Sequence, residues 1–266
     1  MALVEVEAVS RNYPRRIGLR REDRFVVHNV SLTIERGETL GLVGESGSGK
    51  STLARMILGL VEPTSGSIRV AGVEVGGHRT QALRRQMQPV FQDPSAALDP
   101  RMRVIDILIE PFLIHRRTAG EAAIDTRKPA LRTAAQELLV SVGLDESALH
   151  RYPHEFSGGQ RQRINIARAL ALKPQFVVLD EPVSALDVSV GAQIVNLLRS
   201  LQRDHGLTYL FISHSMPLVR YLSTRIAVME KGRLVETGEA EALCADPREQ
   251  YTRQLLAATP ELPVCS

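Results

Sequence analysis

A glycine-rich segment at positions 44–51 carries the strongest chemical signal in the chain. It reads GESGSGKS and matches the pattern GxxxxGK[ST], in which successive backbone N–H groups wrap a chain of phosphates. The helix expected after it points its positive end at the same anion. Lys50 would reach the terminal phosphates, and the hydroxyl of Ser51 would bind Mg²⁺. Glycine is needed there because a side chain would obstruct the wrap and disfavour the required positive φ angles.

Two adjacent carboxylates follow a second apolar stretch. Residues 176–179 read FVVL, and Asp180 and Glu181 come directly after them. Side chains alternate along a strand, so the two carboxylates are expected on opposite faces. Asp180 could then hold Mg²⁺ through a water molecule while Glu181 orients a different water. The alternative is a pair that only caps a strand end, and a phosphate loop in the same chain makes it the weaker interpretation.

A pair of glycines predicts a second anion site within residues 156–160, which read FSGGQ. Ser157 and Gln160 have the spacing of a capping box, which is a purely structural alternative. Gly158 and Gly159 lower helix stability, but they allow a phosphate to approach the helix N-terminus closely.

The elements that must position these residues alternate between strand and helix. Apolar patterns predict strands at 3–9, 30–34, 38–43, 176–179 and 207–212, hairpins at 63–79 and 225–235, and helices at 51–60, 104–115, 130–142, 160–172 and 194–204. Such alternation is typical of an α/β sheet, and strands that are apolar on both faces are typical of parallel strands covered by helices. The helical block at 95–159 interrupts the alternation. It predicts a subdomain inserted into a core of 1–94 and 160–245, with a tail at 246–266.

The composition is that of a globular protein. The 266 residues are 44% hydrophobic and 24% charged, which excludes disordered and low-complexity classes. No apolar run approaches the about 20 residues of a membrane span, and the N-terminus has no signal-peptide features. We therefore expect no membrane crossing and no secretory signal.

The net charge of +3 is too small to predict a nucleic-acid partner. Six arginines between positions 11 and 24 form the one visible basic cluster, in a stretch that resembles a loop. A solvated loop is the leading interpretation, and contact with nucleotide phosphates or anionic lipid is the alternative. Cys244 and Cys265 have no CxxC or histidine partner, which predicts two unpaired thiols in a reducing cytoplasm and no four-cysteine cluster.

The motifs occur in the order and spacing of ABC-type ATPases. They are the phosphate loop, FSGGQRQR at 156–163, FVVLDEP at 176–182, SALD at 184–187 and ISHS at 212–215. Over nearly its whole length the chain resembles the ATP-binding subunit of an ABC transporter. The resemblance implies a P-loop NTPase core of ABC type, with a mostly parallel sheet, an N-terminal antiparallel β portion and the inserted helical subdomain. It also implies ATP and Mg²⁺ as ligands.

The same resemblance assigns catalytic and metal-binding roles. Glu181 would act on the attacking water, and His214 would hold the γ-phosphate and position that water. Gln92, in VFQDP, would sense Mg²⁺ and the membrane partner, and Ser51, Gln92 and Asp180 would form the metal set. Two such domains would face each other, with each ATP between the phosphate loop of one and the SGGQ of the other.

The nucleotide-binding residues implied by the resemblance belong to the phosphate loop, the SGGQ segment, an adenine-stacking position and the domain interface. They are Tyr13, Gly44, Glu45, Ser46, Gly47, Ser48, Gly49, Lys50, Ser51, Thr52, Ser157, Gly158, Gly159, Gln160 and Asp187. Tyr13 is the aromatic residue expected on adenine, with Phe25 as its competitor. The chain departs from the family pattern at Phe156, where leucine is usual, and at Ser215, where aspartate usually follows the histidine.

Three segments resemble the oligopeptide, dipeptide and nickel importers: RYPHEF at 151–156, VFQDPSAALDPRM at 90–102 and DPREQYTRQLLAATP at 246–260. An amphipathic helix that merely packs on the core is an equal interpretation of the last one. The resemblance implies an ATP-hydrolysing motor for uptake of a peptide-like, metal or other small solute. An ATPase of an exporter with separate membrane subunits is the main alternative, and chromosome-maintenance, ribosome-associated and non-enzymatic classes have less support.

The importer resemblance also implies partners and a location. The partners are two transmembrane permease subunits, an extracytoplasmic substrate-binding protein and a second ABC ATPase subunit. A heterodimer of ATPase subunits is expected, and a homodimer is the alternative. The location is the cytoplasmic face of the plasma membrane, as a peripheral subunit, and the cargo stays open.

Overall fold

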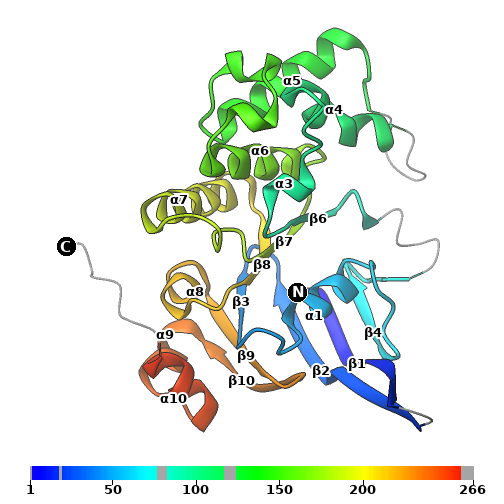
Figure 1. Ribbon diagram of the computed structural model, residues 1–266, viewed down its shortest axis with the longest axis vertical. Helices are drawn as coiled ribbons and strands as arrows, with labels where there is room; N and C mark the ends of the chain where they lie inside the picture. Colours follow the sequence, from blue (N-terminus) through cyan, green and yellow to red (C-terminus); the bar gives the residue numbers. More distant parts are fainter. Residues whose placement is uncertain (1, 18–19, 77–82, 117–123, 259–266) are drawn as a thin grey trace. The chain divides into compact units, whose positions relative to one another are not determined.

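A computed structural model describes residues 2–17, 20–76, 83–116 and 124–258, with the backbone alone for 15–17 and 20–24 (Figure 1). The chain divides into two compact units. The first combines Met1–Thr80 with Thr208–Ser266, and the second is Gln81–Leu207. The expected subdomain at 95–159 stays a prediction.

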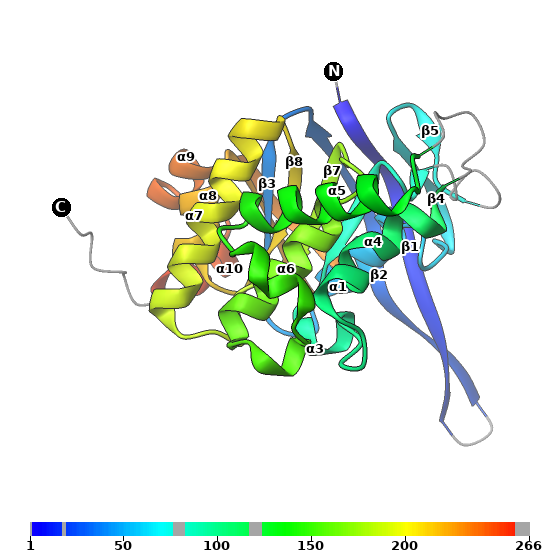
Figure 2. The same cartoon turned by 90° about the horizontal axis from the view of Figure 1, so that it is seen from above.

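The first unit contains a four-stranded antiparallel sheet in the order β2-β1-β4-β5. Its strands are β1 (Ala2–Ile17), β2 (Arg20–Glu35), β4 (Ser65–Val70) and β5 (Val73–Glu74). Figure 2 shows β1 and β2 as a long hairpin whose far end extends beyond the other strands of this unit. The predicted loop across the arginine cluster is therefore wrong. A two-stranded ladder satisfies backbone groups whatever the side chains are, so a charged sequence can continue it.

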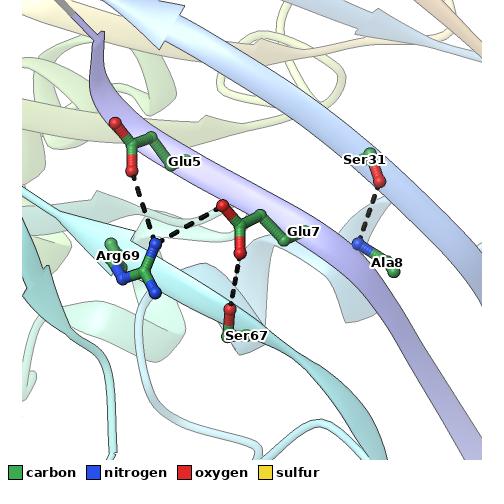
Figure 3. A network of polar contacts seen from close by, with 6 residues as sticks. All are labelled: Glu5, Glu7, Ala8, Ser31, Ser67 and Arg69. Carbon is green, nitrogen blue, oxygen red and sulfur yellow. Dashed lines mark hydrogen bonds and ion pairs between the residues drawn. The ribbon is translucent and has the colours of Figure 1, made fainter.

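The exposed face of this sheet carries a polar network (Figure 3). Arg69 Nη1 lies 3.4 Å from Glu7 Oε1 and 3.9 Å from Glu5 Oε2, and Ser67 Oγ donates to Glu7 Oε2 at 3.2 Å. Exposed ion pairs of this kind contribute at most about 1 kcal/mol each. The neighbouring Val4 and Val6 are buried, so a slip of one residue would expose them. The register of β1 thus rests mainly on the buried face.

The second sheet of this unit is mixed. This unit contributes to it the strands β3 (Thr39–Val43), β8 (Thr208–Ile212), β9 (Arg225–Glu230) and β10 (Arg233–Glu239). Strand β3 runs parallel to both β8 and β9, and β10 pairs antiparallel with β9. Every residue of β3 and β8 is buried, which confirms the expectation drawn from their apolar runs.

Among its described residues, four helices accompany the sheets of the first unit: α1 (Lys50–Ile57), α8 (Met216–Leu222), α9 (Ala240–Ala245) and α10 (Gln250–Ala257). Helix α8 packs directly on β3 at Gly41. A Cβ at Gly41 would lie 2.2 Å from Val219 Cγ1 and 2.5 Å from Ser223 Oγ, so no larger residue fits there without movement. This contact fixes α8 against β3. The loop that follows β3 and the loop that precedes α8 are therefore both attached to this packed pair.

The second unit combines a parallel strand pair with helices. Strand β6 (Met87–Val90) runs parallel to β7 (Phe176–Asp180). The α-helices are α3 (Pro94–Ala97), α4 (Val104–Ile114), α5 (Lys128–Ser141), α6 (Gly158–Leu170) and α7 (Val188–His205), and two 3-10 turns cover Glu146–His150 and Pro153–Glu155. Helices α4, α5 and α6 pack together (Figure 1). All four long helices predicted in this unit are confirmed.

Among the residues that the structure describes, no helix has both the length and the apolar character required to cross a membrane. Cys244 is half-buried and carries a free thiol, whose pKa is raised chiefly by burial. Cys265 lies outside the described residues.

Candidate active site

The phosphate loop connects the buried strand β3 to helix α1. Gly44 and Gly49 adopt positive φ angles of 153° and 106°. A Cβ at Gly44 would lie 2.1 Å from the Met229 carbonyl oxygen, and one at Gly49 would lie 2.4 Å from the Val26 carbonyl oxygen. These two glycines are therefore required twice, for their φ angles and for the close packing of the loop on neighbouring backbone.

Lys50 is folded back into its own loop. Its side chain is buried, with 5% of the residue exposed. Its Nζ donates to the carbonyl oxygens of Gly44 at 2.7 Å and Glu45 at 2.8 Å, and to Ser48 Oγ at 3.4 Å. A buried ammonium needs such partners because desolvation disfavours its charge. The loop thus places a positive charge at the place where the sequence predicts phosphates.

Helix α1 begins without a side-chain cap. Its N-cap is Gly49, whose neighbours in the first turn include no acidic residue. The positive end of the helix dipole is consequently not neutralised by a carboxylate of that turn, which suits an anion. Ser51 and Thr52 lie half-buried in this first turn. The loop is also tied to the β9–β10 turn, because the Gly232 N–H donates to the Ser48 carbonyl oxygen at 2.9 Å.

His214 lies at the same sheet edge as the phosphate loop. Leu42 of β3 pairs with Ile212 of the parallel strand β8, so Gly44 and His214 each come two residues after a paired position. The Ser213 N–H donates to the Leu42 carbonyl oxygen at 3.3 Å, which ties the two segments just before they diverge. His214 is exposed. Within the first unit, the structure therefore brings together the two motifs that the sequence predicts to act on phosphate.

Ser215 is one of the two positions that depart from the family pattern. It is the N-cap of α8, but its side chain makes no capping hydrogen bond. Instead the hydroxyl of Ser213 accepts a hydrogen bond from the Ser215 N–H at 3.0 Å. The turn that carries His214 is thus held by the serine on its other side.

The two aromatic candidates for adenine lie on the β1–β2 hairpin. Tyr13 is 42% exposed and Phe25 is 50% exposed. Asn12 pairs with Phe25, and directly paired residues share a face of the ladder. Tyr13, next to Asn12, is therefore on the opposite face from Phe25. The Arg11 guanidinium lies over the Tyr13 ring at 4.7 Å. One adenine can stack on only one of the two rings, and the choice of Tyr13 stays a prediction.

In the second unit, three predicted residues share one strand edge. Val90 of β6 pairs with Leu179 of the parallel strand β7. Gln92 therefore lies at the same end of this strand pair as Asp180 and Glu181. Gln92 is exposed, and the two carboxylate residues are half-buried.

The expectation that alternation places the two carboxylates on opposite faces does not apply. Glu181 lies beyond the end of β7 and has a φ of 50°, in the left-handed region. Strand alternation holds only for extended backbone. A short turn follows, because Ser184 donates to the Glu181 carbonyl oxygen from its N–H at 3.3 Å and from its Oγ at 3.1 Å. The direction of the Glu181 side chain is thus set by this turn and not by the strand.

The SGGQ segment forms the capping box at the start of α6. The Ser157 N–H donates to Gln160 Oε1 at 3.0 Å, and the Gln160 N–H donates to Ser157 Oγ at 3.3 Å. The structural alternative is therefore correct as a description of the local bonds. It leaves the phosphate role open, because a hydroxyl that accepts one bond still has a proton to donate.

The glycines of this segment allow α6 to pack against the start of α7. A Cβ at Gly159 would lie 2.4 Å from Val190 Cγ1, and one at Gly158 would lie 3.3 Å from Leu186 Cδ2. Asp187 caps α7, with its Oδ1 accepting the Val190 N–H at 2.9 Å. The SGGQ segment and Asp187 thus belong to one packed structure.

Gln162, which no sequence pattern singled out, is only 1% exposed. Its Nε2 donates to the Pro182 carbonyl oxygen at 2.8 Å, and its Oε1 accepts from Asn165 Nδ2 at 3.4 Å. Pro182 directly follows Glu181, so Gln162 links helix α6 to the turn that carries the Glu181 carboxylate. A polar residue on the same helical face as Gly159 and Ile166 is the signal that could have revealed it.

Among the described residues, no group of three or more histidine, cysteine, aspartate or glutamate side chains is arranged to hold a metal ion. The metal set of Ser51, Gln92 and Asp180 stays a prediction.

The comparisons with known proteins show the family of this chain. The sequence profile of the family described as ABC transporter matches residues 27–184. The chain belongs to the ABC transporter family. It is 50% identical to the oligopeptide transport ATP-binding protein OppF of Bacillus subtilis over 238 residues, which are 88% of this chain and 76% of that protein. It is also 46% identical to the OppF protein of Streptococcus mutans over 97% of this chain and 82% of that protein.

Solved ABC cassettes share the fold. One is the dimeric, post-hydrolysis ATP-binding cassette MJ0796 bound to ADP and phosphate, with a TM-score of 0.76 and 29% identity over 89% of this chain and 98% of that one. Another is CbiO1 from Clostridium perfringens, with a TM-score of 0.78 and 25% identity over 92% of this chain and 91% of that one. The predicted ABC-type α/β fold is confirmed, and the chain is an ABC ATPase that binds and hydrolyses ATP.

The buried hydrogen bond from Gln162 to the Pro182 carbonyl oxygen predicts that removing it lowers the stability of this ABC ATPase. Gln162→Met keeps the length of the side chain but removes the donor and leaves the Pro182 carbonyl oxygen unsatisfied. We expect the free energy of unfolding to fall by about 1–3 kcal/mol, measured by urea denaturation. Gln193→Met, at an exposed position of α7, is the matched control and should leave stability unchanged. Equal stability of the two variants would contradict this account of Gln162.

Proposed function

We propose that this ABC ATPase is the motor subunit of an importer that takes up a peptide-like or other small solute through separate permease subunits. The observation that carries the proposal is the extent of the likeness to peptide importers. The relatives include two oligopeptide transport proteins and a putative peptide import ATP-binding protein of Brucella abortus, which is 54% identical over 88% of this chain and 69% of that protein. An identity near one half along most of the chain favours import over export.

The phosphate loop is proposed to bind ATP in this motor. Residues 44–52 would surround the phosphates, with the Lys50 ammonium as the charge nearest to them. Ser51, Gln92 and Asp180 supply a hydroxyl, an amide oxygen and a carboxylate, which are the hard oxygen donors that Mg²⁺ prefers. When bound, Mg²⁺ neutralises charge on the phosphates.

Glu181 and His214 are proposed as the groups that act on the attacking water. A carboxylate can accept the proton of that water as the bond to phosphorus forms. The imidazole of His214 can donate a hydrogen bond to the γ-phosphate. Tyr13 is proposed to stack on adenine.

The remaining predicted residues are proposed to act across a dimer. Ser157, Gly158, Gly159 and Gln160 would contact the nucleotide held by a second ATPase subunit, and Asp187 would lie at the interface between the two. The cassette MJ0796, which shares the fold, is dimeric when bound to ADP. A different ABC ATPase is the proposed second subunit. Two transmembrane permeases and an extracytoplasmic substrate-binding protein complete the proposed complex, on the cytoplasmic face of the plasma membrane.

The role of Glu181 predicts a separation of binding from turnover. Glu181→Gln removes the proton acceptor but preserves the shape of the side chain. We expect steady-state ATP hydrolysis to fall by about 10²–10⁴-fold with little change in ATP affinity. Glu137→Gln, at an exposed position of α5, is the control and should hydrolyse ATP at the wild-type rate. Unchanged hydrolysis by Glu181→Gln would overturn the assignment.

The importer proposal predicts which proteins accompany this chain. The tagged chain is purified from its native membranes in mild detergent, and every co-purifying chain is identified by mass spectrometry. Two permeases, a second ATPase and a substrate-binding protein are the expected result. Permeases without any binding protein would favour export, and recovery with no membrane partner would contradict a transporter.

A further inference from the structure

The C-terminal tail contains a helix that the predicted function does not use. Helix α10 is held beside β10 by Glu236, whose carboxylate accepts the Arg248 N–H at 2.9 Å and the Glu249 N–H at 3.2 Å (Figure 1). Burial alone would raise the pKa of Glu236, but the hydrogen bonds from these two N–H groups favour the charged form, and its pKa is lowered. The start of the helix is therefore fixed to the sheet by a charged acceptor.

This docking brings Tyr251 to the phosphate loop. The hydroxyl oxygen of Tyr251 accepts a hydrogen bond from the Glu45 N–H at 3.0 Å, across 206 positions of sequence. Tyr251 is half-buried, and the burial raises the pKa of its phenol. The group therefore stays protonated and neutral at physiological pH.

The bond to Tyr251 is made by the peptide unit that also holds Lys50. The peptide between Gly44 and Glu45 has one carbonyl and one N–H. The Gly44 carbonyl oxygen accepts the Lys50 ammonium at 2.7 Å, and the Glu45 N–H donates to Tyr251. Both polar groups of this unit are thus engaged, on one side by the lysine of the phosphate loop and on the other by the C-terminal helix. A peptide unit is planar, so fixing its N–H also fixes its carbonyl.

Charged residues of the β9–β10 turn interact with Glu45 and Tyr251. Lys231, in the β9–β10 turn, forms an ion pair with Glu230 at 3.0 Å. The pKa of Lys231 is raised, first by its hydrogen bond to Glu230 and to a smaller degree by the negative charge of Glu45.

We propose that Tyr251 is a positioning residue for nucleotide binding: it fixes the Gly44–Glu45 peptide, and through the Gly44 carbonyl it sets the position of the Lys50 ammonium. Helix α10 is then part of the ATP site, and the C-terminal tail is more than a packing element. The proposal rests on the phosphate-binding role proposed above for Lys50. It assigns no contact between Tyr251 and the nucleotide.

The test removes the hydroxyl and keeps the ring. Tyr251→Phe in the full chain should raise the dissociation constant for ATP about 3- to 10-fold, the effect of one net hydrogen bond. The affinity is measured by isothermal titration calorimetry. Tyr221→Phe, at a 50% exposed position of α8, is the matched control and should bind ATP with wild-type affinity. Equal affinities of Tyr251→Phe and the wild type would overturn the proposal.

A second measurement separates positioning from a general loss of structure. Hydrogen exchange at the Glu45 amide, followed by NMR in the nucleotide-free chain, should accelerate about 5- to 10-fold in Tyr251→Phe, because that amide loses its acceptor. The amides of Arg248 and Glu249, which bond to Glu236, should exchange at the wild-type rate. Equal acceleration at all three amides would overturn the proposal, because the effect would then belong to the docking of α10.

The ATP affinities of two variants distinguish an error in the role of Tyr251 from an error in the proposed ATP site. If Lys50→Ala binds ATP as tightly as the wild type, the proposed role of the phosphate loop is wrong. If Lys50→Ala loses affinity while Tyr251→Phe does not, only the positioning role of Tyr251 is wrong.

Discussion

The structure of the candidate site depends on keeping one positive charge inside a loop of backbone. The Lys50 ammonium is almost fully buried and is satisfied by carbonyl oxygens of the loop that precedes it. That arrangement requires the loop to wrap tightly, and Gly44 and Gly49 allow it by their φ angles and by close contact with neighbouring backbone. The β9–β10 turn and the C-terminal helix both form hydrogen bonds with this loop. The charge is therefore in place before any phosphate arrives, which reduces the reorganisation that binding requires.

Parallel strand pairs bring the remaining chemistry to shared edges. In the first unit, β3 and β8 end together and are followed by the phosphate loop and His214. In the second unit, β6 and β7 end together and are followed by Gln92 and the Asp180–Glu181 pair. Helix α6, which begins with the SGGQ segment, connects to this edge in a different way. Its N-terminal glycines pack on α7, and the buried amide of Gln162 donates to the carbonyl oxygen of Pro182, the residue after Glu181. A change at SGGQ can thus reach the turn that carries the proposed catalytic carboxylate.

Local pattern was sufficient to predict most of the strands and the long helices, because the apolar spacing lies within a few residues, but it missed β6. Local pattern failed where contacts with residues distant in sequence determine the conformation or the role of a residue. The arginine cluster has no strand-like pattern, yet the β1–β2 ladder continues through it. Alternation could not place Glu181, because a turn outside the strand fixes its backbone. The roles of Gln162 and Tyr251 depend on contacts with Pro182 and Glu45, which no spacing within the sequence indicates.

The central claim is that the loop at 44–51 binds the phosphates of ATP through the charge that it holds. The most direct test compares the ATP affinity of Lys50→Ala with that of the wild type by isothermal titration calorimetry. Lys128→Ala, at an exposed position of α5, serves as the control. The account predicts that Lys50→Ala weakens ATP binding by about 10-fold or more, as expected for the loss of a hydrogen bond to a charged group, and that the control binds normally. Wild-type affinity in Lys50→Ala would contradict the account.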